Sequence, residues 1–121
     1  MIPKFRAWSK LASRMYIVNG LYFDRGMVQY ANNDNAIRFI KLENIILMQS
    51  TCLFDKNNKE IFEGDIVLVL DSPYTVFYDN ERGSYRLKPH DDRWNVDYMS
   101  NFSHGGNFEV VGNIYENKEY L

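Results

Sequence analysis

Few residues in this 121-residue chain could carry catalytic or metal chemistry. The chain has two histidines and one cysteine, so a zinc site would have to rely on carboxylates, against the usual preference for nitrogen and sulfur ligands. His90, Asp91 and Asp92 form the one cluster of metal-ligand residue types, and residues 1–89 contain no histidine that could join it. We interpret this cluster as a solvated loop and expect neither a metal nor a cofactor.

Nucleophilic catalysis would need a thiol or hydroxyl activated by a base. Cys52 could be paired with His90 or His104, but the residues around Cys52 match no nucleophile signature, and a small, mostly buried β-sheet residue is the expected alternative. The chain has no GxGxxG motif and no glycine loop followed by a Walker lysine, which disfavours nucleotide-dependent chemistry. The sequence therefore predicts a protein that is not an enzyme.

Basic and aromatic residues alternate near the start of the chain. The candidate partner-binding residues are Lys4, Arg6, Trp8, Lys10 and Arg14. In one interpretation, residues 4–16 stack bases and hold phosphates, as single-strand nucleic-acid binders do. In the other, the segment is a strand with its aromatic side chains inward and its basic stems covering apolar surface. In both, four cations in one segment make it the best candidate for contact with an acidic partner.

The composition is that of an ordinary globular protein. Hydrophobic residues make up 45% and charged residues 25%, and the net charge of −2 provides no global field for a polyanion or an anionic membrane. A single cysteine excludes an internal disulfide framework and suits a reducing cytoplasm. No apolar run approaches the roughly 18 residues of a membrane span. We therefore expect a cytoplasmic protein with no membrane partner.

Strand-like runs recur about every ten residues, separated by turn residues, which indicates a mainly β fold with little helix. The runs are Lys4–Trp8, Met15–Phe23, Gly26–Tyr30, Ile37–Leu42, Ile45–Gln49, Ile66–Leu70, Tyr74–Tyr78, Ser84–Lys88, Trp94–Met99 and Phe108–Tyr115. Tyr74–Tyr78 and Ser84–Lys88 alternate most clearly and predict a hairpin.

The expected architecture is one domain over residues 1–121, built of antiparallel sheets, with an SH3-like small barrel in the C-terminal half. If the domain is divided, the seam is expected near the polar segment 55–64, after which Gly64-Asp65 opens an apolar strand. Hairpins leave edge strands, and an aromatic content of 16% is high for one small core, so we also expect a homo-oligomer.

Four ordered blocks resemble the YopX family of phage and prophage proteins. The blocks are Lys4–Trp8, Leu47–Thr51, Asp55–Val67 and Val110–Asn117. The resemblance runs nearly from end to end of the chain. At two positions where the family usually has glycine, this chain has Cys52 and Asn58. Asn tolerates a left-handed turn, whereas Cys52 fits less well at a position where the backbone approaches closely.

The resemblance implies a small, mainly β protein encoded by a phage or prophage, and it supplies no activity or cofactor. We expect an accessory protein that binds a macromolecule, most readily a host or phage protein. The alternative is a small single-stranded nucleic-acid binder using residues 4–16. Three residues of the blocks are expected to be critical for the fold: Gly64 and Asp65 at a strand entrance, and Gly112 where two strands pack closely.

Overall fold

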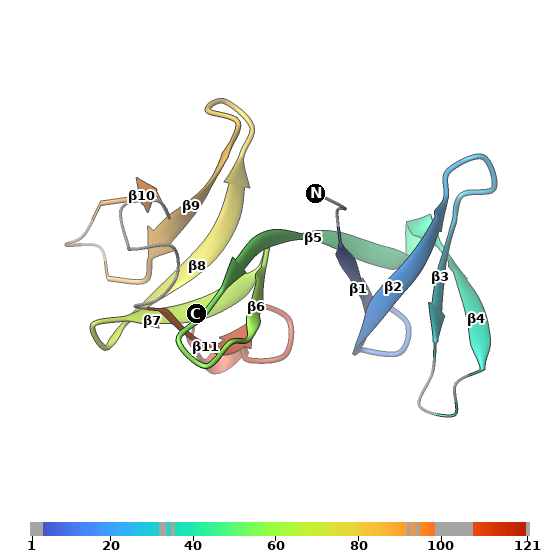
Figure 1. The fold of residues 1–121 in the computed structure, drawn as a ribbon, viewed down its shortest axis with the longest axis horizontal. Coiled ribbons are helices and arrows are strands. Elements are labelled where there is room, and N and C mark those ends of the chain that lie inside the picture. Colours follow the sequence, from blue (N-terminus) through green and yellow to red (C-terminus); the bar gives the residue numbers. More distant parts are fainter. Residues whose placement is uncertain are drawn as a thin grey trace. The chain divides into compact units, whose positions relative to one another are not determined.

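The regular secondary structure of the described residues is almost entirely antiparallel β, as the sequence predicts (Figure 1). The computed structural model describes residues 4–31, 34, 36–91, 93, 95–98 and 108–120. The strands of this part are β1 (Phe5–Ser9), β2 (Arg14–Tyr22), β3 (Met27–Ala31), β4 (Ile37–Lys41), β5 (Ile45–Phe54), β6 (Glu60–Phe62), β7 (Asp65–Val69), β8 (Ser72–Asp79), β9 (Ser84–Pro89), β10 (Asp97–Tyr98) and β11 (Phe108–Asn113). Two short 3-10 turns, η1 (Leu42–Asn44) and η4 (Lys118–Tyr120), complete them. No helix in the described ranges is long and apolar enough to cross a membrane.

The chain divides into two compact units, residues 1–49 and residues 50–121. The boundary falls inside β5, whose first half pairs with β1 and whose second half pairs with β6. The boundary between the two units therefore lies before residues 55–64, near which the sequence predicts a seam between two subdomains. The two units are described separately below.

The first unit contains the strand order β4-β3-β2-β1-β5, in which all neighbours are antiparallel (Figure 1). Side chains alternate between the two faces of a strand, and the register places Ala7 and Val28 on the same face. Both are buried, together with Ile45. Other apolar side chains pack against this cluster: Val18, Leu21, Ile40, Leu42 and Leu47. One face of the sheet is thus the core face of the first unit.

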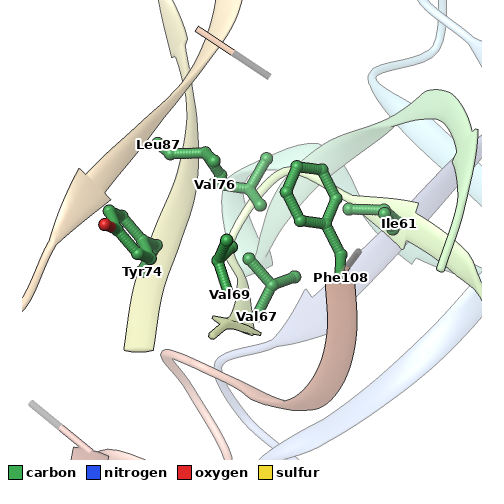
Figure 2. Close-up of a cluster of buried hydrophobic side chains, with 7 residues drawn as sticks. All are labelled: Ile61, Val67, Val69, Tyr74, Val76, Leu87 and Phe108. Atoms are coloured by element: carbon green, nitrogen blue, oxygen red, sulfur yellow. The ribbon is translucent and has the colours of Figure 1, made fainter. Parts of the chain in front are cut away.

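The second unit contains a sheet with the order β10-β9-β8-β7-β11. The predicted hairpin is confirmed, because β8 pairs with β9 from Tyr74 opposite Pro89 to Asp79 opposite Ser84. Figure 2 shows the core of this unit, which consists of Ile61, Val67, Val69, Tyr74, Val76, Leu87 and Phe108. The aromatic and β-branched side chains that suggest strands in the sequence therefore fill this core.

The second half of β5 and the strand β6, in the middle of the chain, are not predicted from the sequence. β5 continues to Phe54, five residues beyond the predicted end, and β6 is an additional short strand. The pairing of β5 with β6 shifts register between Ser50 and Phe54, and this irregularity obscures the alternation by which a strand is recognised. Of the predicted strand 94–99, the structure has strand at Asp97–Tyr98, while residues 94 and 99 lie outside the described part.

Candidate interaction surface

The basic and aromatic segment lies largely within a sheet rather than on a free surface. β1 pairs with β2 on one side and with β5 on the other. Lys4 precedes the strand and is exposed, whereas the side chain of Arg6 is only 8% exposed and Trp8 is half-buried. Arg6 is therefore not part of an exposed basic surface.

The other two cations of the segment lie beyond β1. Lys10 is exposed in the following turn, where its Nζ donates a hydrogen bond to the backbone oxygen of Glu43 at 3.3 Å. Arg14 begins β2 opposite Ser9, so it belongs to the face of the sheet opposite to that of Arg6. The structure does not bring the five predicted partner-binding residues together on one face.

Gly64 and Asp65 form a tight turn between β6 and β7. Gly64 has a φ of +87°, in the left-handed region that favours glycine, and its N–H donates to the Val76 oxygen at 2.8 Å. Asp65 is 2% exposed, and its Oδ2 accepts the N–H of Phe62 at 2.8 Å. The Gly64 oxygen also accepts the N–H of Ile114 at 3.0 Å. The backbone of Gly64 and the carboxylate of Asp65 thus connect β6, β8 and the segment after β11.

Gly112 lies beneath a side chain rather than between two strands. A Cβ atom at this position would lie 2.9 Å from the Cβ of Asn117 and closer still to its Cγ and Oδ1. The Asn117 Oδ1 accepts the N–H of Asn113 at 3.1 Å and so caps the end of β11. The close approach expected from the sequence is therefore made to the C-terminal turn.

Asp55 is a buried carboxylate that the sequence places only at the start of a turn. Its Oδ1 accepts the N–H groups of Asn57 at 2.9 Å and Lys59 at 2.8 Å, and its Oδ2 accepts that of Val110 at 2.9 Å. Burial favours a higher pKa for Asp55, but these backbone donors and the charge of Lys59 outweigh it and lower the pKa. Asp55 joins the 55–59 turn to β11.

The polar groups of Asp91 and Arg93 bind each other, and His90 binds β8. A ring nitrogen of His90, Nε2, shares a hydrogen bond of 2.7 Å with the Thr75 hydroxyl. The Asp91 carboxylate binds the guanidinium of Arg93, with a shortest distance of 2.6 Å, and this contact lowers the pKa of Asp91 to about 2. In the described ranges, no group of three or more His, Cys, Asp or Glu side chains could hold a metal ion.

Cys52 lies in the irregular part of the β5–β6 pairing and is half-buried. Its φ of +65° is in the left-handed region, and its N–H donates to the Ser50 hydroxyl at 3.0 Å. Asp92 and His104, the other residues considered for metal binding or catalysis, lie outside the described residues. Cys52 thus adopts a left-handed conformation within the irregular β5–β6 pairing.

The first unit has an apolar surface on the face opposite its core, which the sequence analysis does not single out. Four large apolar side chains on this face are exposed: Ile17 (66%), Tyr22 (37%), Ile37 (64%) and Phe39 (52%). The register places them together, because Phe39 lies opposite Gln29 and Tyr22 opposite Met27, on the face that Val28 does not share. We call these four residues the apolar face.

Two aromatic rings of the apolar face line a small cavity that is open to the surface. The centroids of Tyr22 and Phe39 are 5.9 Å apart in an edge-to-face arrangement, and the Tyr22 hydroxyl donates to Gln29 Oε1 at 2.9 Å. The cavity has a volume of about 160 Å³ and is lined by these two rings together with Arg25 and Met27.

A second cavity adjoins the first, because Arg25 and Met27 line both. Its volume is about 360 Å³, and its lining residues are Arg25, Gly26, Met27, Lys41, Leu42 and Glu43. Arg25 and Lys41 are exposed, and in the part of the chain that the structure describes neither forms an ion pair. The apolar face is thus bordered by two available cations and one acid.

The residue pattern of the strand predicted over residues 37–42 shows apolar side chains on it, but does not show which face of the strand is exposed. Residues 37–42 are predicted as a strand in which Ile37 and Phe39 occupy one face and Ile40 the other. Both faces are apolar, so alternation alone does not show which one is the core. Pairing with β3 resolves this, because it sets Ile40 opposite the buried Val28.

Comparisons with known proteins agree with the family resemblance. The family model described as YopX protein matches residues 4–121. The crystal structure of protein EF1440 from Enterococcus faecalis superimposes with a TM-score of 0.67 at 28% sequence identity, and the alignment covers 100% of this chain and 99% of that one. No curated protein matches the chain.

Proposed function

The chain belongs to the YopX family, and we propose that it is a non-enzymatic module that binds another protein through the apolar face. The observation that carries this proposal is the exposure of Ile17, Tyr22, Ile37 and Phe39 together on one sheet face. Contiguous exposed apolar side chains, aromatic ones in particular, are typical of protein interaction sites. The bordering cations give this surface the polar rim that such sites usually have.

The proposed setting is a bacterial cytoplasm, with a phage or prophage as the source of the chain and a host or phage protein as its partner. The family resemblance supports the phage origin. The presence of a single cysteine supports a reducing compartment. A second copy of the chain could also cover the apolar face, and light scattering coupled to size exclusion at tens of micromolar measures this directly.

The nucleic-acid alternative has less support from the placement of its residues. Residues 4–16 would need their cations on one accessible surface to hold successive phosphates, but Arg6 is buried and Arg14 belongs to the other face. A salt titration of binding to a labelled oligonucleotide tests it, since phosphate contacts give a steep salt dependence.

For the second unit we propose an SH3-like arrangement. Its support is the tight Gly64-Asp65 turn that opens β7, followed by the consecutive hairpins β7–β8 and β8–β9. In the described residues the sheet has two ends, β10 and β11, and pairing between these two strands would close it into a barrel.

Site-specific photocrosslinking tests the proposed function. A benzophenone side chain is introduced at Phe39 in the full chain, and the matched control carries it at Leu70, which is 90% exposed in the β7–β8 turn of the second unit. After irradiation in host cells, we expect protein adducts at position 39 that are absent at position 70 and that decrease when Ile17→Ser is added. The same adducts at both positions would contradict the proposal.

A further inference from the structure

We propose that the outer edge of β4 and the two cavities beside it form a docking site for an extended, acidic segment of a partner protein. The segment would add to the sheet as a further strand next to β4. This inference rests on the proposed protein-binding function and specifies the chemistry of its partner.

The first argument is the open edge of β4. The strand lies at the end of the order β4-β3-β2-β1-β5, and in the described ranges it pairs only with β3. In an antiparallel pair, alternate residues direct their N–H and C=O groups away from the neighbouring strand. An extended peptide can satisfy these groups by adding to the edge, which is a recurrent mode of peptide recognition.

The second argument is the pattern of side chains along β4. Ile37, Phe39 and Lys41 share one face of the strand, in the order apolar, aromatic, basic, and all three are exposed. A strand paired with β4 would place its own alternate side chains beside these three. The favoured segment therefore has two apolar residues at alternate positions, followed or preceded by an acidic residue beside Lys41.

The third argument is the distribution of charge around the cavities. Arg25 and Lys41 border the larger cavity and form no ion pair among the described residues, whereas Glu43 is the one acid in its lining. A ligand carboxylate is thus favoured near the two cations and disfavoured near Glu43. Such an arrangement selects for acidic residues and also sets where they bind.

Two other occupants match this surface less well. A second copy that paired its own β4 antiparallel about Phe39 would set Ile37 opposite Lys41, and because residues 37–41 contain no acid, it would leave Arg25 and Lys41 unneutralised. A nucleic-acid strand would need several unpaired cations in line, but the larger cavity has two in its lining, Arg25 and Lys41, and Arg38 of β4 lies on the other face of the strand, where it pairs with Asp34 at 3.3 Å. The net charge of the whole chain is −2. The acidic peptide satisfies both the edge and the charges.

Selection from a random nine-residue peptide library against the full chain tests the proposal. We expect enriched peptides with apolar residues at alternate positions and an acidic residue two positions from the last of them. The most enriched peptide is then synthesised with a fluorescent label, and its affinity is measured by fluorescence polarisation. Lys41→Glu should weaken its binding at least fivefold, Phe39→Ser should weaken it at least tenfold, and Glu43→Gln should strengthen it about twofold.

The control variant is Leu70→Ser, which removes an equally accessible apolar side chain from the second unit and should leave the affinity unchanged. Circular dichroism verifies that each variant is folded. The proposal is overturned if no peptide is enriched, if the enriched peptides lack the acidic residue, or if Lys41→Glu leaves the affinity unchanged. Displacement of the peptide by a labelled oligothymidine would also overturn it, in favour of a nucleic-acid strand. A free protein that is a dimer, and that dissociates only when Phe39→Ser is introduced, would overturn it in favour of a second copy of the chain. Specific crosslinks at Phe39 in the absence of peptide binding would leave the proposed function standing and reject only this docking mode.

Discussion

Replacement of Asp55 is the substitution for which the structure gives the clearest expected result. Asp55 is 6% exposed, and its carboxylate accepts three backbone N–H groups, two from the 55–59 turn and one from Val110 in β11. In Asp55→Ala all three N–H groups lose their acceptor. In Asp55→Asn, the amide oxygen can still accept from Asn57 and Lys59, but the amide NH₂ group then faces the Val110 N–H, and two donors oppose each other.

The size of the effect follows from how well water can replace each bond. Asn57 and Lys59 are exposed, so their N–H groups can turn to solvent, and the loss of each charge-assisted bond costs about 1 kcal/mol. Val110 is partly buried in a strand, and leaving its N–H without an acceptor costs about 1–3 kcal/mol. We therefore expect Asp55→Ala to lower the free energy of unfolding by about 3–5 kcal/mol and Asp55→Asn by about 1–3 kcal/mol. At roughly 4 °C per kcal/mol, the alanine variant should melt about 10–20 °C lower.

Acid should reduce the difference between the wild type and Asp55→Asn. The pKa of Asp55 in the folded protein lies below its value of about 3.9 in an unfolded chain. Its stabilising contribution is therefore complete above the unfolded pKa and is lost as the pH falls through the folded pKa. The wild type should lose stability over this range more steeply than the variant, which has no carboxylate to protonate at this position.

Thermal melts by circular dichroism from pH 7 to pH 2.5, together with hydrogen exchange at the Val110 amide, measure these effects. The matched control is Asp91→Asn, since the Asp91 carboxylate also has a lowered pKa but pairs with the largely exposed Arg93. It should leave the melting temperature at pH 7 nearly unchanged. Equal melting temperatures for Asp55→Ala and the wild type, with the Val110 amide still protected, would refute the reasoning.

Substitutions at three further positions test the local backbone geometry of the second unit. Asp65→Ala should lower stability by about 1 kcal/mol or more because the Phe62 N–H loses its acceptor, whereas Asp65→Asn should be partly tolerated; a melt equal to that of the wild type for Asp65→Ala would contradict this. Gly112→Ala should cost about 1–3 kcal/mol through overlap with Asn117, and less when Asn117→Gly is present, as a double-mutant cycle by urea denaturation would show. Cys52→Gly should raise stability by about 0.5–1 kcal/mol because it relieves a left-handed backbone, and a lower midpoint in the same assay would argue against strain there.

Most of the strands were predictable from sequence because their signals are local. In residues 74–88, alternation and turn residues identify a hairpin, and the structure pairs it as expected. Cys52 and Asn58 occupy positions at which the family resemblance implies glycine, and the structure has a positive φ at both, +65° and +62°. A short-range property such as the backbone conformation of a turn can therefore be read from one segment.

What could not be predicted depends on pairing between distant residues. Asp55 and Val110 are 55 positions apart, and no local pattern indicates that the carboxylate of one accepts the N–H of the other. Arg6 illustrates the same limit, because a cation in a short aromatic strand reads as a surface residue, while pairing of β1 on both sides places it in the interior of a sheet. The burial of a polar side chain is set by tertiary contacts and not by its neighbours in the chain.

The same limit applies to which acidic side chains are buried and which apolar side chains are exposed, because neither can be predicted from the local sequence. Asp55 and Asp65 read in the sequence as polar residues at a turn and at a strand entrance, yet each is buried and its carboxylate accepts at least one backbone N–H group, which stabilises the local conformation of the chain. Ile37 and Phe39, in contrast, read as core residues, yet they are exposed beside an open strand edge. Ile37 and Phe39 belong to the apolar face on which the proposed protein-binding function rests, whereas the buried acids stabilise turns.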